Sequence, residues 1–235
     1  MPMKVISIMR SGDLASIALS GCPMKCAYCA HGRQDRRDMA LEKVVAEVSI
    51  DAVKRVYIGG MDPLIQRKEV VPFVKTLKQR GKEITLKTSG NDPVTIRELL
   101  PFVDRFALEI KCPLDDTGCW SSLSGQGEEW VGAFLPRLRE SLEAIKGRPL
   151  RIMTRVIPGY INKDKVRRIG EQLAPYADEA ILNQFLGNPM NDVPWNGIEV
   201  ASPPVDEMLD LGEELVKHIP LVKVQCSGFQ RELRR

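Results

Sequence analysis

The chain has 235 residues, 43% of them hydrophobic, and a formal net charge of +3. This length is compatible with one α/β domain, and the charge is too small by itself to indicate binding to nucleic acid or to a membrane surface. No signal-peptide pattern stands at the N-terminus and no apolar run approaches the ~18 residues of a membrane span. We therefore expect a cytoplasmic protein without membrane association.

Short β-branched runs alternate with longer amphipathic segments, which predicts βα units around a parallel sheet. The expected strands are 15–20, 53–60, 83–89, 105–111, 150–158 and 179–185, and the expected helices are 40–49, 68–81, 93–102, 129–147 and 164–176. Six strands suffice for a partial (β/α)6 TIM-like barrel. We expect a single domain, 1–235, with a core barrel over about 15–185 and a C-terminal extension over about 186–235.

The two ends of the chain carry weaker signals. Residues 3–10 are expected to form a short extra strand of unknown register, 204–219 a last helix, and 221–229 a closing edge strand. Residues 187–204 are rich in Gly, Asn and Pro, which predicts an irregular loop. The charged C-terminal stretch FQRELRR is expected to be a solvated or frayed tail.

Three cysteines gather in one polar loop, SGCPMKCAYCAHGRQDRRD, with the spacing C-x3-C-x2-C: Cys22, Cys26 and Cys29. Three thiolates are one too many for a disulfide and one too few for structural zinc, but in a [4Fe–4S] cluster they leave one iron open for a small molecule. His31 as a fourth ligand would instead give a zinc-stabilised, non-catalytic binding module. The loop follows an expected strand, and barrel enzymes hold their sites at that end of the strands.

The cysteine spacing, with Tyr28 directly before the third cysteine, resembles the signature of the radical S-adenosylmethionine (radical SAM) superfamily. The resemblance implies a partial barrel of the radical SAM type, a [4Fe–4S] cluster on the three cysteines, and S-adenosylmethionine bound at the open iron with Tyr28 beside its adenine. It also implies reductive cleavage of S-adenosylmethionine to a 5′-deoxyadenosyl radical that abstracts a hydrogen atom. The cofactors carry this chemistry, so no side chain is expected to be catalytic.

The second strand ends in Gly59-Gly60-Met61-Asp62-Pro63, which resembles the Gly-Gly-Glu-Pro segment of that superfamily. There the glycines let the backbone approach the methionine end of the cofactor, and the acidic residue holds its amino group. Because a thioether is a weak acceptor, either backbone carbonyls suffice here or Asp62 takes this role. A simple turn is the alternative for the two glycines.

The third and fourth strands end in further matching segments. Thr88 and Ser89 lie where the superfamily has Thr-Asn-Gly, so a hydroxyl would face the ribose or methionine, unless this is only the polar end of a strand. Leu-Glu-Ile-Lys-Cys-Pro resembles the Asp-x-Lys segment of glycyl-radical activating enzymes. Glu109 and Lys111 would point to the same side of the strand and pair near the cofactor, with a surface ion pair as the alternative.

The last two strands complete the resemblance. Arg155, before Pro158-Gly159, would bind the cofactor carboxylate, and Asn183 and Gln184 would contact the adenosine. The segment around Gln184 is similar to the Gln-Gln-Phe of activating proteins for anaerobic ribonucleotide reductase. The chain thus resembles glycyl-radical activating enzymes of the ribonucleotide reductase and pyruvate formate-lyase types.

This resemblance predicts that the hydrogen atom comes from a glycine of a partner enzyme, and that a ferredoxin- or flavodoxin-type protein supplies the electron. A radical enzyme acting on a small molecule or on RNA is the alternative, because the Gly-Gly segment is altered and an arginine-rich stretch follows the cysteines. Nucleic acid therefore stays open as a partner. Cys112, Cys119 and Cys226 are expected to be ordinary thiols, with an auxiliary cluster as the alternative.

Overall fold

The computed structural model describes residues 2–26, 28–29, 34–187 and 200–235. Backbone contacts divide the chain into two compact units, which are described separately. Unit 1 comprises Met1–Pro23, Cys29–Leu108 and Arg137–Pro149, and unit 2 comprises Met24–Tyr28, Glu109–Pro136 and Leu150–Arg235. These boundaries differ from the expected division near residue 185, and the single domain stays a prediction.

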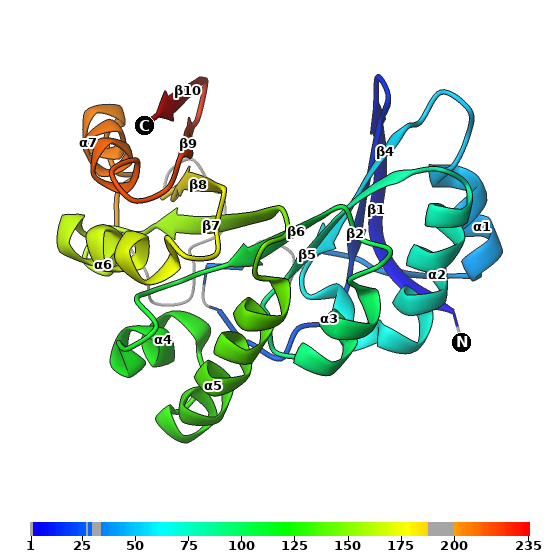
Figure 1. Ribbon diagram of the computed structural model, residues 1–235, viewed down its shortest axis with the longest axis horizontal. Helices are drawn as coiled ribbons and strands as arrows, with labels where there is room; N and C mark the ends of the chain where they lie inside the picture. Colours follow the sequence, from blue (N-terminus) through cyan, green and yellow to red (C-terminus); the bar gives the residue numbers. More distant parts are fainter. Residues whose placement is uncertain (1, 27, 30–33, 188–199) are drawn as a thin grey trace. The chain divides into compact units, whose positions relative to one another are not determined.

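Unit 1 contains the first strands of the chain (Figure 1). They are β1 (Met3–Ser11), β2 (Leu14–Leu19), β3 (Arg37–Met39), β4 (Arg55–Gly60), β5 (Glu83–Thr88) and β6 (Arg105–Glu109), hydrogen-bonded in the order β3-β1-β2-β4-β5-β6. Strands β2, β4, β5 and β6 are parallel, as βα units require, and β1 runs antiparallel to β2 with Ile8 opposite Ile17. The first four expected barrel strands and the extra N-terminal strand are therefore confirmed.

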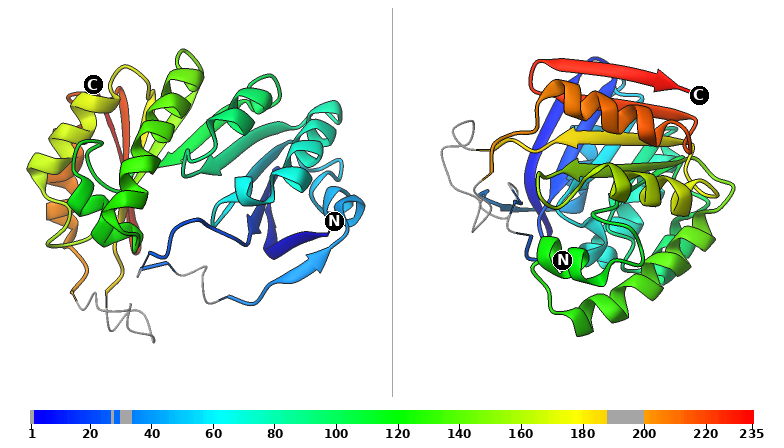
Figure 2. Two further views of the ribbon diagram at one scale, coloured as in Figure 1. Left: turned by 90° about the horizontal axis from the view of Figure 1, so that it is seen from below. Right: turned by 90° about the vertical axis from the view of Figure 1, so that its left-hand side faces the viewer.

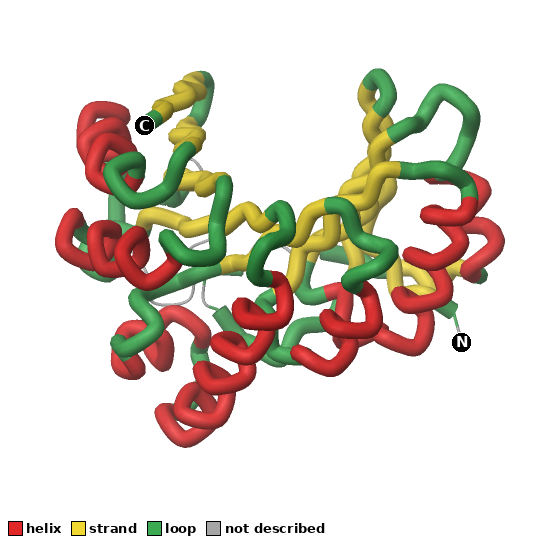
Figure 3. Tube along the Cα trace, viewed as in Figure 1, coloured by secondary structure: helices red, strands yellow, loops and turns green. Residues whose placement is uncertain are grey.

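The helices of unit 1 lie on one face of these strands (Figure 3). They are α1 (Leu41–Val48), the 3-10 helix η2 (Pro63–Gln66), α2 (Arg67–Gln79) and α3 (Pro93–Leu99). Helix α2 buries Val70, Phe73, Val74 and Leu77, the i, i+3, i+4, i+7 stripe of an amphipathic helix. Unit 1 therefore has its own apolar core, and its loops at the carboxyl ends of β2, β4 and β5 share one edge.

Unit 2 contains the other strands: β7 (Leu150–Val156), β8 (Glu179–Gln184), β9 (Leu221–Cys226) and β10 (Phe229–Arg234), in that order. Strands β7, β8 and β9 are parallel, and β10 is antiparallel to β9. Helices α6 (Lys163–Leu173) and α7 (Val205–Leu215) cover one face of them (Figure 2). Alternate residues of β7 are buried, so the strands expected at 150–158 and 179–185 are confirmed.

Some expectations need correction, and others concern residues that the structure does not describe. The C-terminal stretch is no frayed tail, because β9 ends at Cys226 and a turn at Gly228 leads into β10, whose side chains are mostly exposed. Helix α4 (Thr117–Ser124) was not expected, whereas the helix expected at 129–147 is confirmed as α5 (Glu128–Ile145). His31 and residues 188–199 of the irregular loop lie outside the described residues. None of the described helices has the length and apolar character needed to cross a membrane.

Candidate cofactor site

In unit 1, the start of the cysteine loop is bonded to the segment that follows β4. Backbone N–H groups of Met61 and Asp62 donate to the carbonyls of Leu19 and Gly21 at 3.0 and 2.8 Å, and Gly21 N–H donates to Met61 Sδ at 3.2 Å. The thioether, expected to be a weak acceptor, therefore contacts the protein's own loop. Two segments 40 residues apart meet where the sequence predicted the cofactor.

Gly60 is required at this junction. Its φ of +94° lies in the left-handed region, and a Cβ there would stand 2.5 Å from the backbone nitrogen of Leu19. Only glycine lets β4 turn this close to β2. The Gly-Gly segment is therefore more than a surface turn, whereas its contact with a cofactor stays a prediction, as does that of Gly59.

Asp62 joins the ends of β4 and β5. Its carboxylate is buried, with 3% of the residue exposed, and Oδ1 accepts from Leu64 N–H at 3.3 Å and from the Thr88 hydroxyl at 2.9 Å. Oδ2 accepts from both the N–H and the hydroxyl of Ser89. Three residues that were predicted separately as cofactor ligands thus form one hydrogen-bonded group. Their contact with a cofactor stays a prediction.

Asp62→Asn is expected to lower the free energy of unfolding by about 2–3 kcal/mol. Whichever way the amide is turned, its NH2 faces a backbone N–H, of Leu64 or of Ser89, and backbone donors cannot reverse. Asp92→Asn is the matched control, expected to cost less than about 1 kcal/mol, because Asn is an equally good helix cap and the Thr95 hydroxyl can turn round. Urea unfolding of the two variants compares them, and equal losses would contradict the Asp62 geometry.

A second group of predicted residues lies in unit 2. Lys111 Nζ donates to Tyr28 Oη and to Glu109 Oε1, both at 2.7 Å. Burial raises the pKa of the Tyr28 phenol and outweighs the opposing effect of Lys111, so the hydroxyl stays protonated. Burial lowers the pKa of Lys111, but Glu109, Tyr28 and Cys26 act the other way and hold it well above its usual range. The expected Glu109–Lys111 pair is present, and it is a largely buried pair, not a surface one.

The third group lies on β7 and β8 of unit 2. Arg155 stands opposite Asn183 in the register of the two parallel strands, and Arg155 Nη1 donates to the Gln184 carbonyl at 3.0 Å. The Gln184 amide donates to the Pro203 carbonyl and accepts from Ser227 N–H, each at 2.8 Å. The amide of Gln184 therefore fixes the following segments, which leaves Arg155 and Asn183 as the better candidates for contact with a cofactor.

The three loop cysteines have the chemistry that a cluster needs. Cys22, Cys26 and Cys29 are all outside disulfides and partly exposed, so their sulfurs can be reached from solvent. Cys22 and Cys29 belong to unit 1 and Cys26 to unit 2. Over the described ranges, no group of three His, Cys, Asp or Glu side chains is gathered as in a metal site. The donor set fits an iron–sulfur cluster, and the ligand roles stay a prediction.

The expectation that the remaining cysteines are ordinary thiols is wrong for two of them, because Cys112 and Cys119 form a disulfide. Asp116 accepts from Cys119 N–H at 2.9 Å and so begins α4, whose first turn contains Cys119. Reconstituted protein is expected to hold about four iron and four sulfide per chain, the content of a single cluster. Elemental analysis measures this, and about eight of each would restore the auxiliary cluster.

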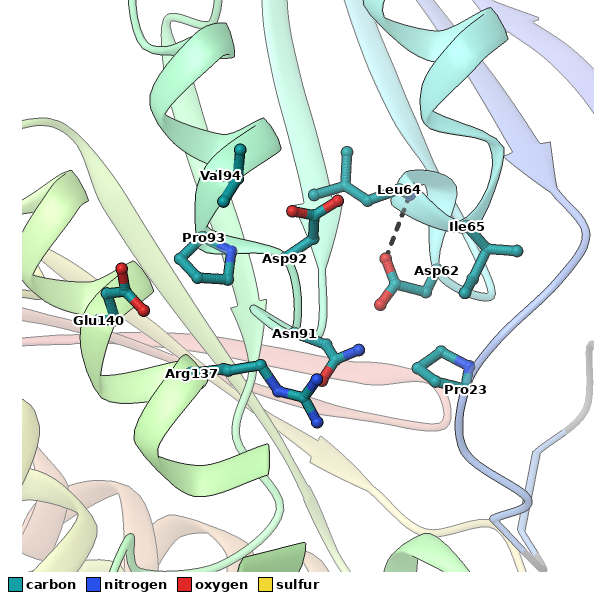
Figure 4. A pocket seen from close by; sticks show the side chains of 10 residues that line it. All are labelled: Pro23, Asp62, Leu64, Ile65, Asn91, Asp92, Pro93, Val94, Arg137 and Glu140. Carbon is teal, nitrogen blue, oxygen red and sulfur yellow. Dashed lines mark hydrogen bonds between the residues drawn. The ribbon is translucent and has the colours of Figure 1, made fainter. Parts of the chain in front are cut away.

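A pocket of about 440 Å³ adjoins the Asp62 group within unit 1 (Figure 4). The Asp62–Leu64 hydrogen bond lies on one side, with Arg137 and Glu140 of α5 on the other. Its apolar rim includes Ile65 and Val94, which are 52% and 65% exposed. The carboxylates of Asp62 and Glu140 already have partners, whereas Asn91 Oδ1, which also belongs to the lining, is buried without a hydrogen-bond partner.

Some residues that hold the site were missed by sequence reasoning. Gln66 donates to the Lys4 and Ser20 carbonyls at 3.0 and 2.8 Å and ties η2 to the start of the cysteine loop. Ser124 and Gly125, at the end of α4, hold Lys25 of the same loop. Only the N-cap Asp116 and Gly125 could have indicated α4.

Comparison with known proteins gives the relatives of the chain. A protein of Methanocaldococcus jannaschii, provisionally named a glycyl-radical enzyme activating enzyme, is 24% identical over 93% of this chain and 91% of its own length. A 7-carboxy-7-deazaguanine synthase of Methanospirillum hungatei is 33% identical over 41% of each chain. Among solved structures, a radical SAM methyltransferase from Sphaerobacter thermophilus matches with a TM-score of 0.68 and 20% identity, over 93% of this chain and 68% of its own.

The structural match confirms the expected α/β fold class, a partial (β/α)6 TIM-like barrel of the radical SAM type. The family model of the radical SAM superfamily matches residues 16–169, more than half of the chain. That match also confirms the expected cofactors, a [4Fe–4S] cluster and S-adenosylmethionine, and it gives no support to a zinc-binding module. The chain belongs to the radical SAM superfamily.

Proposed function

We propose that this radical SAM enzyme activates a partner protein by taking a hydrogen atom from one of its glycines. The observation that carries the proposal is the match to the Methanocaldococcus protein over nearly the full length of both chains. The Glu109–Lys111 segment, which resembles the Asp-x-Lys of glycyl-radical activating enzymes, forms the pair expected there.

In this proposal Cys22, Cys26 and Cys29 hold the cluster, which when bound supplies the electron that cleaves S-adenosylmethionine. The residues of the chain bind and orient the cofactors. Gly59 and Gly60 let the backbone approach the cofactor closely, and Asp62 holds Thr88 and Ser89 in place beside the cofactor. The other proposed cofactor-binding residues are Tyr28, Glu109, Lys111, Arg155, Asn183 and Gln184.

Charge is the main contribution of the residues in unit 2. The Arg155 guanidinium has donors beyond the one used on the Gln184 carbonyl, and it is proposed to bind the cofactor carboxylate. Lys111 stays protonated although it is buried, because the carboxylate of Glu109 balances its positive charge. A ferredoxin- or flavodoxin-type protein is the proposed electron donor.

The test supplies S-adenosylmethionine and dithionite to the reconstituted protein without oxygen. We expect 5′-deoxyadenosine, and on addition of purified glycyl-radical enzymes of the ribonucleotide reductase and pyruvate formate-lyase types, a glycyl doublet in the electron paramagnetic resonance spectrum. Deuterium from a glycine-labelled partner should appear in 5′-deoxyadenosine. Cofactor cleavage with no doublet and no deuterium transfer from either enzyme would contradict the activase proposal.

A radical SAM enzyme that modifies a small molecule or RNA is the second candidate. The local match to a 7-carboxy-7-deazaguanine synthase favours a small molecule, and the arginine-rich stretch after the cysteines favours RNA. Binding of RNA would weaken steeply as salt is raised, because phosphate contacts release counterions. Deuterium transfer from a labelled small molecule or RNA, and none from a partner protein, would establish this alternative.

A further inference from the structure

The middle of the cysteine loop belongs to unit 2, where two separate contacts hold Lys25 and Tyr28. The first is at the carboxyl end of α4, where Lys25 N–H donates to the Ser124 carbonyl at 2.8 Å. Gly125 lies against the same residue with a φ of +65°, and a Cβ there would stand 2.4 Å from the Lys25 carbonyl oxygen. Only glycine permits this contact.

The second contact is made by side chains. Tyr28 and Lys111 are 7% and 4% exposed, and the Lys111 ammonium donates to Tyr28 Oη at 2.7 Å while lying 5.0 Å from the centre of its ring. Glu109, at 2.7 Å, neutralises the ammonium. An isolated buried charge is unstable, so the trio is stable only as a set. Tyr28 is therefore fixed at its hydroxyl end by a charge-assisted hydrogen bond.

The two contacts belong to one connected piece of structure. Lys111 directly precedes Cys112, whose disulfide to Cys119 joins the segment after β6 to the first turn of α4. Cys26 lies in sequence between the two contacts, two residues before Tyr28, whose hydroxyl accepts the hydrogen bond from the Lys111 ammonium.

We propose that Lys111 is a positioning residue for the cysteine loop: it holds Tyr28, and through it the part of the loop that carries the proposed ligand Cys26, and its ammonium sets a fixed positive charge close to this part of the loop. The inference rests on the proposed ligand role of the three cysteines and makes no use of the identity of the substrate. Charge and hydrogen bonding around the sulfurs of a cluster tune its reduction potential. Lys111 should therefore affect both the potential and the retention of the cluster.

The reduction potential tests the charge. In reconstituted protein without S-adenosylmethionine, Lys111→Met is expected to shift the potential to a more negative value, and Glu109→Gln to a more positive one. Lys111→Arg keeps the charge and should stay close to the unmodified protein. Lys163→Met is the matched control, because this lysine is exposed to solvent, which screens its charge, and pairs with Asp210, so its loss should leave the potential unchanged.

The rate of iron loss to a chelator tests the hydrogen bond. Tyr28→Phe and Lys111→Met are each expected to accelerate iron loss on the order of tenfold. The double variant should be no faster than the faster single variant, because both changes break the same contact. Tyr28→Phe removes only a hydroxyl, so it reports on the contact even if Lys111→Met disturbs the fold, which a thermal melt would show.

The outcomes separate this inference from the proposed function. If the unmodified protein loads a cluster but Lys111→Met leaves the potential unchanged, or the two rate effects multiply, the positioning role of Lys111 is wrong and the cluster assignment stands. If the unmodified protein holds no cluster after reconstitution, the ligand role of the cysteines fails first.

Discussion

Replacing Cys22, Cys26 or Cys29 by alanine is expected to abolish both cluster binding and cleavage of S-adenosylmethionine. Each thiolate holds one iron, so removal of any one of them leaves an iron of the cluster without its protein ligand. Alanine is the informative change, since a serine oxygen can still coordinate iron. Iron and sulfide content after anaerobic reconstitution, and 5′-deoxyadenosine formed with dithionite, measure the two losses.

Cys226→Ala is the control for these variants. Cys226 ends β9, is partly exposed like the loop cysteines, and burial raises the pKa of its thiol, which disfavours the thiolate. This variant should keep its iron and its cleavage activity. A loop variant that still cleaves the cofactor, or a Cys226 variant that loses its iron, would overturn the assignment of the ligands.

The order of the elements could be predicted because their periodicities differ. Buried residues alternate along β7, and they recur at helical spacing along α2, so the two patterns are told apart in the sequence. Helix α4 could not be predicted in this way, because its sequence, Thr-Gly-Cys-Trp-Ser-Ser-Leu-Ser, has little amphipathic pattern. Its start is set by the Asp116 cap. Strand β10 was missed because an edge strand tolerates charges that resemble a solvated tail.

The candidate site shows a similar division. The motif residues were predicted because each lies at the end of a recognisable strand. The contacts between these residues were not predicted, because they depend on how far β5 extends relative to β4. Ile58 of β4 stands opposite Leu86 of β5, and this register brings Thr88 to Asp62. A hydrogen bond between residues 26 positions apart has no local signature.

The change from Gly-Gly-Glu-Pro to Gly-Gly-Met-Asp-Pro has a structural consequence. Met61 Sδ accepts from the Gly21 N–H at 3.2 Å, whereas the Asp62 carboxylate turns to Thr88 and Ser89. The sequence showed that the acidic residue had moved by one position. That the new arrangement also fixes the start of the cysteine loop follows only from the contacts.

Gly60→Ala should be the most destabilising single change at this junction, with an expected loss of about 3–5 kcal/mol in the free energy of unfolding. The φ of +94° strains any residue with a Cβ, and here the Cβ would also overlap the Leu19 backbone, at 2.5 Å from its nitrogen and 2.6 Å from its oxygen. Backbone cannot move aside as the end of a flexible side chain can. Strands β2 and β4 would have to separate.

Gly81→Ala separates these two effects. Gly81 has a φ of +69°, but a Cβ there would meet no heavy atom within 4 Å, so only the strain of about 1 kcal/mol applies. Urea unfolding of the two cluster-free variants gives the difference, which measures the close approach of β4 to β2. If both variants lose the same stability, the Leu19 contact is absent. If the Gly60 variant loses more and also fails to retain a reconstituted cluster, the junction that holds Gly21 also holds the cysteine loop that follows it.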